Sequence, residues 1–209
     1  MFQTFSPNML KTFKLCPKKF YFKYIKKISM PANDEIFELG KNIHALASYY
    51  LKKEYLDKLE SSLNSREKEI WQYLKGIKYF SYETVNTEYN LAVKINDVFF
   101  GGRLDALVKN DGKYYILDYK TGSVPQNAKY DFQTMIYMLS VSKFFKTEDI
   151  NFVYLDLKNK SEVVIQLTPN LIKEYEEKLI EVADKINNED FYAKKSSACR
   201  CEYDVICYD

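Results

Sequence analysis

Two acidic residues and a lysine can share one small site if two neighbouring strands pair. Asp118 and Lys120 are two positions apart in an apolar stretch, so on a strand their side chains point to the same face. The turn signal at 110–112 predicts a hairpin that places Asp105, on the preceding strand, beside Asp118. Two carboxylates and one ammonium group suit a hard divalent cation with a bound water next to the lysine. The spacing therefore predicts a divalent-metal site.

The Asp-x-Lys spacing recurs elsewhere, so it does not identify the site alone. Asp111 and Lys113 lie in a turn signal. Asp156 and Lys158 end a second predicted strand, but no strand before them supplies another acid at a matching distance. We interpret this last pair as a solvent-facing strand end.

The cysteines are unevenly distributed, with one near the N-terminus and three within the last eleven residues: Cys16, Cys199, Cys201 and Cys207. Structural disulfides are rare in cytosolic proteins, so the grouping favours a tetra-thiolate site that joins the two ends of the chain. Such a site can hold zinc or an iron–sulfur cluster. Unrelated buried thiols are the alternative.

Composition indicates one globular domain spanning residues 1–209. The chain has 31 Lys and Arg against 29 Asp and Glu, is 46% hydrophobic, and contains only 6 Gly and 5 Pro, which excludes a disordered or collagen-like protein. The longest uncharged stretch, 132–142, is shorter than the ~20 residues of a membrane-spanning helix. Because no apolar signal-peptide core follows Met1, we expect a soluble cytoplasmic protein with no membrane partner.

The N-terminal segment is basic, because every charged residue before Asp34 is a lysine. Aromatic residues alternate with these lysines, as on a surface that follows a phosphate backbone and stacks bases. The alternative is a solvated helix face above a core-facing aromatic stripe. The sequence leaves both interpretations open.

Periodicity predicts helices that alternate with strands. Ser6 and Pro7 are typical of a helix start, and Thr168 and Pro169 are typical of another. We expect helices over 7–15, 36–59, 70–80, 128–145 and 169–188, a three-stranded meander over 84–120, and a strand pair over 151–157 and 162–167. This order indicates a sheet covered by helices, an α/β or α+β core.

Several short motifs occur in a specific order over nearly the whole chain. They are Cys16-Pro17 with Phe20, Gly40-x-x-x-His44, Gly102-Arg103-Leu104-Asp105, Asp118-Tyr119-Lys120-Thr121-Gly122, Gln133-x-x-x-Tyr137, and the C-terminal cysteines. In this order and spacing the sequence resembles the RecB-like branch of the PD-(D/E)XK nuclease superfamily. Within that branch it is similar to compact iron–sulfur members such as the CRISPR-associated RecB-like exonucleases.

The resemblance implies a restriction-endonuclease-like mixed β-sheet flanked by helices. It also implies a Mg²⁺- or Mn²⁺-dependent deoxyribonuclease, an exonuclease on single-stranded ends. Roles carry over position by position: His44, Asp105, Asp118 and the carbonyl of Tyr119 as metal ligands, Lys120 as the group that orients the attacking water, Gln133 and Tyr137 as positioning residues, and Glu88 as an upstream acid. Without the motif, His44 would be read as a core imidazole.

The resemblance also implies a [4Fe–4S] cluster at the four cysteines, in a region formed by residues 1–30 and 190–209, with zinc as the alternative. One residue, where the family has two, separates Cys199 from Cys201, so Cys16, Cys201 and Cys207 are the safer ligands. The expected partners are DNA and CRISPR integrase or helicase-type proteins. DNA contacts are expected from Lys18, Lys19, Lys23 and Arg103. A non-cleaving nucleic-acid-binding module and a zinc-stapled adaptor are the competing functions.

Overall fold

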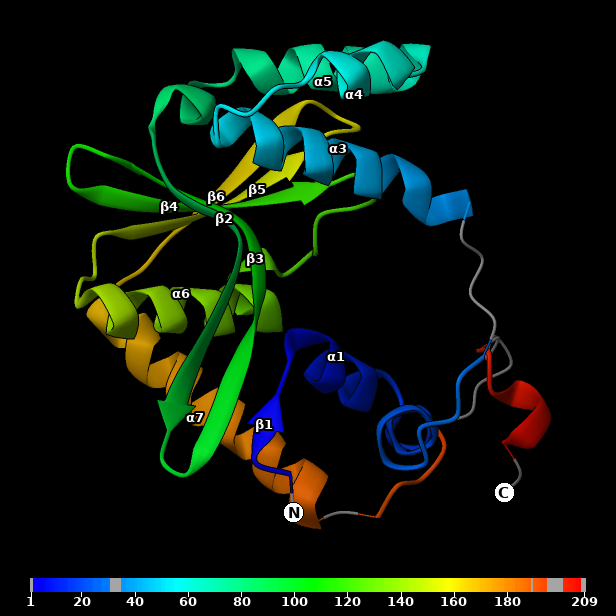
Figure 1. Cartoon of the computed structure of the whole chain (residues 1–209). Coiled ribbons are helices and arrows are strands. Elements are labelled where there is room, and N and C mark those ends of the chain that lie inside the picture. The colour runs from blue at the N-terminus through cyan, green and yellow to red at the C-terminus, as the bar shows by residue number, and fades with distance from the viewer. Residues whose placement is uncertain (1, 31–34, 189, 195–200, 208–209) are drawn as a thin grey trace.

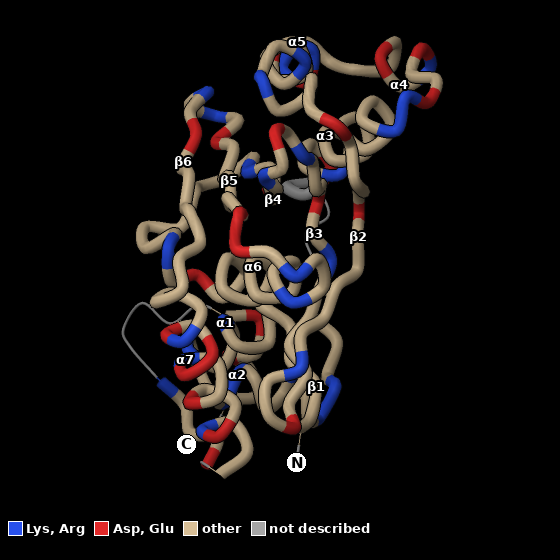
Figure 2. Tube along the Cα trace, turned by 90° about the vertical axis from the view of Figure 1, so that its left-hand side faces the viewer, with Lys and Arg blue, Asp and Glu red and all other residues tan. Residues whose placement is uncertain are grey.

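A computed structural model describes residues 2–30, 35–188, 190–194 and 201–207. The described strands form one six-stranded mixed sheet between two helical layers (Figure 1). The helices α3, α4 and α5 cover one face, and α1, α6 and α7 cover the other, an arrangement also seen in the turned view of Figure 2. The mixed sheet flanked by helices confirms the predicted fold class.

The predicted strands are all present, and one strand was not indicated by the sequence. The strand bounds are β1 (Thr4–Phe5), β2 (Glu83–Ile95), β3 (Val98–Asn110), β4 (Lys113–Lys120), β5 (Ile150–Asp156) and β6 (Ser161–Gln166). β2, β3 and β4 form the antiparallel meander, and β5 pairs with β6. β5 runs parallel to β4, so the connection between them crosses over through α6. β1 was missed because two residues carry no periodic signal.

The main helices are α1 (Pro7–Leu15), α2 (Pro17–Phe20), α3 (Glu35–Leu51), α4 (Asp57–Ser62), α5 (Ser65–Gly76), α6 (Phe132–Phe145) and α7 (Pro169–Asn188). The prediction of one helix over 36–59 was wrong, because α3 ends at Leu51. Lys53 adopts a left-handed backbone with φ 59°, and its N–H donates to the Tyr50 carbonyl, which closes the helix. The start of α6 was also placed too early, because the Asp131 side chain caps this helix by accepting from the Gln133 N–H.

The long strand β3 divides the sheet. β2 pairs along almost all of one edge of β3. On the other edge, β1 pairs with 99–100 and β4 pairs with 106–110, so among the described strands none pairs with 101–105 on that edge. The sheet therefore forks at Asp105, where β1 and β4 separate along the same edge of β3. Polar groups of β3 that no described strand pairs remain accessible at this fork, and the paired strands around them hold them in place.

Each face of the sheet carries its own apolar core. Leu117 and Val153 point into the core under α3 and α5, whereas Ile116 and Phe152 point into the core with α6 and α7. This alternation follows from the two-residue period of a strand. Among the described residues, no helix is both long enough and apolar enough to cross a membrane.

Residues from the two ends of the chain pack together. The Phe191 ring stacks on Phe20 at 5.9 Å, and the Lys18 N–H donates to the Tyr192 carbonyl at 3.0 Å. The Tyr203 hydroxyl donates to the Ile28 carbonyl at 2.8 Å. Segments separated by most of the sequence thus contact one another directly, and both termini lie on the same side of the sheet (Figure 1).

The close pairing of β2 with β3 predicts a backbone clash at Gly101. A Cβ atom there would lie 2.8 Å from both the Ala92 Cβ and the Leu91 carbonyl oxygen. We expect Gly101→Ala to lower the free energy of unfolding by about 1–3 kcal/mol, as overpacking does. Gly76→Ala is the control, because nothing lies within 4 Å of that position and alanine favours helices. Urea denaturation of both variants measures the difference, and an equal stability would contradict the predicted clash.

Candidate active site

Several residues of the motifs, among them His44, Lys120 and Gln133, line a cleft of about 920 Å³ at the fork of the sheet. α3 forms one wall, and β2, β3 and the end of β4 form the rest. Asn8 of α1 and Gln133 of α6 also line the cleft. Elements from α1 to α6 therefore surround one hollow.

Asp105 connects three elements within this cleft. Its Oδ2 accepts from the Tyr119 backbone N–H of β4 at 2.9 Å, and its Oδ1 lies 3.2 Å from His44 Nδ1 of α3. Pairing between β3 and β4 ends at Ala106 and Leu117. Just beyond this point, the Asp105 carboxylate accepts the next free backbone N–H of β4 in place of a strand carbonyl. This places Asp105 at the centre of the fork rather than on a regular strand face.

His44 faces oxygen acceptors on both sides of its ring. Nε2 lies 3.1 Å from the Tyr119 carbonyl oxygen, opposite the contact of Nδ1 with Asp105. Burial lowers the pKa of His44, but the hydrogen bond and charge of Asp105, with a further contribution from the charge of Asp118, outweigh it and raise the pKa above its ordinary value. A ring protonated on both nitrogens can donate to both oxygen acceptors.

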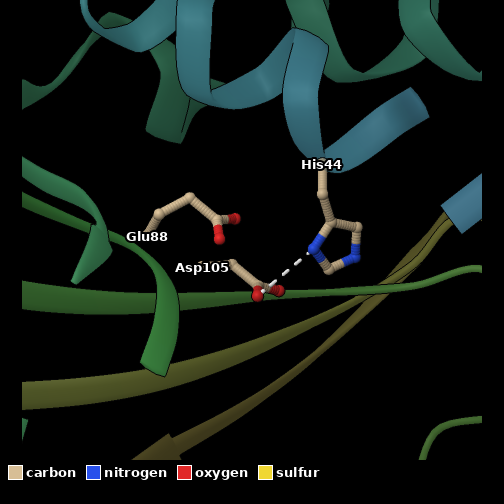
Figure 3. A group of neighbouring side chains, drawn as sticks. All are labelled: His44, Glu88 and Asp105. Carbon is tan, nitrogen blue, oxygen red and sulfur yellow. Dashed lines mark ion pairs between the residues drawn. The ribbon is translucent and has the colours of Figure 1, made fainter. Parts of the chain in front are cut away.

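Glu88 completes a group of three potential metal ligands, shown in Figure 3. One ligand atom each of His44, Glu88 and Asp105 lies within 4.8 Å of the others. Glu88 has φ 50° in the middle of β2, a left-handed conformation that is uncommon for a residue with a side chain and costs backbone strain within a strand. Its Oε2 also accepts from Arg103 Nε at 2.9 Å.

Asp118, Lys120 and Gln133 form a second group next to the first. The Lys120 ammonium lies 2.7 Å from Asp118 Oδ2 and 3.2 Å from Gln133 Oε1. The Gln133 side-chain amide donates to Asp118 Oδ1. The glutamine thereby holds the carboxylate and the ammonium in a fixed relation.

The Asp118 carboxyl is only 2% exposed. Burial, followed by the negative charge of Asp105, raises the pKa of Asp118 to about 6 despite the opposing effect of Lys120. A carboxyl with such a pKa carries an unfavourable charge at neutral pH. An added cation would relieve this cost, which is one physical argument for metal binding at the site.

Tyr137 contacts the scaffold of the site rather than its open space. Its hydroxyl donates to the Arg103 carbonyl at 2.9 Å, and the residue is 5% exposed. A Cβ atom at Gly102 would lie 2.9 Å from this hydroxyl, so the glycine allows the ring to reach β3. The tyrosine thus fixes the strand that carries Asp105.

The other Asp-x-Lys pair has a different environment. Asp156 accepts from the N–H groups of Lys158 and Asn159 and from the Asn159 side chain, so it organises the turn between β5 and β6. Asp156 therefore lies at a strand end as predicted, but the expectation that it faces solvent was wrong, because the residue is buried against this turn.

The predicted cysteine and lysine groups lie away from the cleft. Cys16, Cys201 and Cys207 are half-buried in the terminal segments, and Cys199 lies outside the described residues. Lys19 pairs with Glu202 at 2.8 Å, and the Lys18 ammonium lies over the Tyr21 and Phe22 rings. Lys23 is exposed, and its ammonium lies over Tyr24.

The aromatic side chains between these lysines divide between core and surface. Phe13, Phe20 and Phe22 are buried, so their rings serve as core, as in the aromatic-stripe alternative. Lys23 is exposed, whereas Lys18 and Lys19 are half-buried and Lys19 is ion-paired with Glu202. The sequence analysis missed Asn8 and Lys41, which also line the cleft, because neither belongs to a motif or a periodic pattern.

Comparison with known proteins places this geometry in a family. The family model described as the PD-(D/E)XK nuclease superfamily matches residues 4–81 and 50–208. The chain belongs to the PD-(D/E)XK nuclease superfamily. Members of this superfamily use divalent metal ions, and the two carboxylates and one imidazole of Figure 3 are a suitable donor set for such an ion.

Two relatives agree with this assignment. The chain is 23% identical over 204 residues to the CRISPR-associated exonuclease Cas4 of Francisella tularensis subsp. novicida (strain U112), covering 97% of this chain and 92% of that protein. The fold matches the crystal structure of a candidate exonuclease from Eubacterium rectale with a TM-score of 0.60 at 12% identity, covering 95% of this chain and 86% of that one. The predicted nuclease family is therefore confirmed.

The buried charge of Asp118 predicts a pH-dependent stability. The folded pKa of about 6 lies above the unfolded value, so the folded state binds the proton more tightly and loses stability as pH rises from about 4 to 6. We expect Asp118→Asn to raise the free energy of unfolding of the metal-free protein by on the order of 2 kcal/mol at pH 8 and by much less at pH 4. Asp97→Asn is the control, because Asp97 is 97% exposed. Thermal melting in a chelator at both pH values checks this, and a destabilised Asp118→Asn at pH 8 would contradict it.

Proposed function

We propose that this chain is a Mg²⁺- or Mn²⁺-dependent deoxyribonuclease that acts as an exonuclease on single-stranded DNA ends. The observation that carries the proposal is the pair of adjacent groups at the fork: His44, Glu88 and Asp105 beside Asp118, Lys120 and Gln133. Membership of the nuclease superfamily supports cleavage of DNA. The relative described as an exonuclease supports attack at ends.

His44, Glu88 and Asp105 are the described residues best placed to hold the metal ion. Asp118 and the Tyr119 carbonyl are further proposed ligands, since the carbonyl already lies 3.1 Å from the His44 ring. When bound, the ion supplies Lewis acidity and positive charge at the scissile phosphate. Metal binding at His44 requires a neutral ring nitrogen, so the ion and a proton compete for this side chain.

Lys120 contributes the remaining positive charge. Its side chain is 23% exposed, so the ammonium can reach a substrate in the cleft while Asp118 and Gln133 hold it in place. The ammonium orients the attacking water and stabilises the charge that develops on the phosphate oxygens in the transition state. Gln133 and Tyr137 act as positioning residues, because they contact the catalytic side chains and strand β3.

Cleavage should depend on Lys120 and Asp118 but not on the second Asp-x-Lys pair. We expect Lys120→Ala and Asp118→Ala each to reduce the rate at least about 100-fold, because one removes transition-state charge stabilisation and the other a buried carboxylate of the site. Lys158→Ala has the same spacing from an aspartate and should keep its activity. Digestion of end-labelled single-stranded DNA with Mg²⁺ or Mn²⁺ measures all three. Undiminished cleavage by Asp118→Ala would remove this assignment, and a wild-type protein that binds DNA without cleaving it would identify a binding module.

We further propose that residues 1–30 and 190–209 together form a cluster-binding region of the single domain. Contacts between the ends support this, including the Lys19–Glu202 ion pair and the packing of Phe22 on Tyr203 at 5.6 Å. Cys16 lies at the junction of α1 and α2 with an extended backbone. A [4Fe–4S] cluster on the four cysteines would join these segments and stabilise the fold rather than take part in cleavage.

The cluster proposal predicts a coloured protein. Purified without oxygen, the protein should be brown with a broad absorbance near ~400 nm from thiolate-to-iron charge transfer. Cys16→Ala and Cys207→Ala should remove the colour and lower the melting temperature, whereas Cys199→Ala should have a smaller effect because of its shortened spacing. Iron and zinc are measured in the same samples. A colourless anaerobic preparation with stoichiometric zinc would overturn the iron–sulfur proposal and leave the nuclease site unaffected.

The biological setting is proposed on the resemblance of the whole chain to a CRISPR-associated exonuclease. In that setting the protein is cytoplasmic and works with CRISPR integrase or helicase-type proteins. Lys18, Lys19 and Lys23 supply phosphate contacts outside the cleft, and Arg103 supplies one at its rim, where its side chain is 64% exposed.

A further inference from the structure

A second hollow lies along α1, near the active-site cleft. One part of it, about 400 Å³, lies between α1 and the start of α6, and a larger part, about 690 Å³, lies between α1, α6, α7 and residues 192–194. Lys14, Tyr130 and Phe132 line both parts, so the two are continuous. We call this hollow the lateral groove. Figure 2 shows α6, α1 and α7 gathered on one side of the sheet, with both lysines and acidic residues along α7.

The lateral groove begins next to the catalytic groups. Asn8 lines the cleft, and Lys11, one helical turn further along α1, lines the groove. The Lys11 ammonium lies 2.9 Å from Asp131 Oδ1, and the same oxygen accepts from the Gln133 N–H. Gln133 in turn contacts Asp118, so a chain of direct contacts leads from the groove to the site.

The groove carries a small excess of positive charge, because three of its five lining lysines (Lys11, Lys178 and Lys185) are ion-paired with acidic residues of the same lining. Lysines outnumber the acidic residues that line it, and Lys14 is exposed with its ammonium 5.8 Å from the Phe132 ring. Lys178 lies 5.1 Å from the Tyr130 ring and 3.8 Å from Glu174. Lys194 donates to the Lys14 carbonyl at 3.0 Å, which brings a third ammonium to the same wall. Such a surface attracts a polyanion.

Aromatic rings accompany these lysines. The Tyr192 side chain is 54% exposed at the groove, and Tyr130 is partly exposed there. The Tyr192 backbone is held by the Lys18 N–H and by the packed ring of Phe191, so the wall is formed before any ligand arrives. Lysines that alternate with accessible rings can contact phosphates and stack unpaired bases at the same time.

We propose that the lateral groove binds an unpaired strand of the DNA substrate where this strand extends beyond the catalytic cleft. A duplex keeps its bases stacked inside, so it would leave the aromatic rings of the groove without a partner. This proposal rests on the proposed nuclease function, because it requires that the catalytic cleft binds DNA. The groove thus extends the substrate contact well beyond the residues that perform cleavage.

The test compares two double variants with equal loss of charge. Lys14→Gln with Lys178→Gln removes lysines of the groove, and Lys113→Gln with Lys173→Gln removes exposed lysines outside it. Binding of a fluorescent oligothymidine of about 20 nucleotides, longer than the roughly 4–16 nucleotides that single-strand grooves cover, is measured by anisotropy over a range of salt in a chelator. The groove variant should lower the slope of log K against log salt by about 1.4, since each phosphate contact on a single strand contributes about 0.7. The control variant should match the wild type.

A second variant tests the stacking contacts. Tyr192→Leu should weaken binding of the oligothymidine at least about five-fold with an unchanged salt slope, because it removes stacking and no charge. A duplex of the same length should bind equally to the wild type and to Tyr192→Leu. Thermal melting shows that the variants are folded.

Two outcomes would overturn the proposal, and a third would overturn only the nuclease function on which it rests. If the groove variant binds single-stranded DNA as tightly as the control variant, the strand does not lie in the groove. Cleavage of the same DNA by the wild type would still support the nuclease function in that case. If Tyr192→Leu and the lysine substitutions weaken duplex binding as much as single-strand binding, the groove does not select an unpaired strand. If the groove variant loses binding while the wild type fails to cleave with any divalent metal, the groove stands and the nuclease function falls.

Discussion

The carboxylate of Asp105 holds the fork of the sheet together, and most features of the site depend on it. One oxygen accepts the Tyr119 N–H where pairing between β3 and β4 ends, and the other contacts His44 of α3. Removing this side chain would leave the Tyr119 N–H of β4 and the Nδ1 of His44 without their partner at a half-buried position, a cost typical of a broken buried network. The same carboxylate raises the pKa of both His44 and Asp118, so it determines the geometry and the electrostatics together.

Around Asp105 the protein keeps an arrangement that is unfavourable for folding but suited to binding a cation. Asp118 is buried with a raised pKa, and Glu88 adopts a left-handed backbone in the middle of a strand. Each of these features costs free energy in the metal-free protein. The buried Asp118 and the left-handed Glu88 each bring a negative charge close to Asp105. A divalent ion bound between these carboxylates would offset the free-energy cost of this arrangement. Lys120, fixed by Gln133, provides only part of the compensation because the pKa of Asp118 stays above its ordinary value.

The periphery of the molecule links the site to the two ends of the chain. α1 carries Asn8 at the cleft and ends at Leu15, just before Cys16, and residues that follow α7 pack against the segment after Cys16. The proposed cluster region, the lateral groove and the active site therefore share one helix. A change at the terminal segments that moves α1 would also alter the wall of the groove, so stability of the ends and binding of the DNA strand are physically coupled in this arrangement.

The local elements and the residue types of the site were largely readable from the sequence. The alternation of apolar and polar residues predicted the meander, and Ser6 and Thr168 predicted two helix starts. Asp118 and Lys120, two positions apart, were predicted to share one strand face. These signals could be read because they depend only on neighbours in the chain. The helix end at Leu51 and the strand β1 depend on a left-handed residue and on a distant partner strand, and neither has a periodic signal. Only the tertiary structure showed that Glu88, rather than Asp118, lies grouped with His44 and Asp105, and that α1 and α7 form a groove beside them. These arrangements result from packing between segments far apart in sequence, which spacing along the chain does not encode.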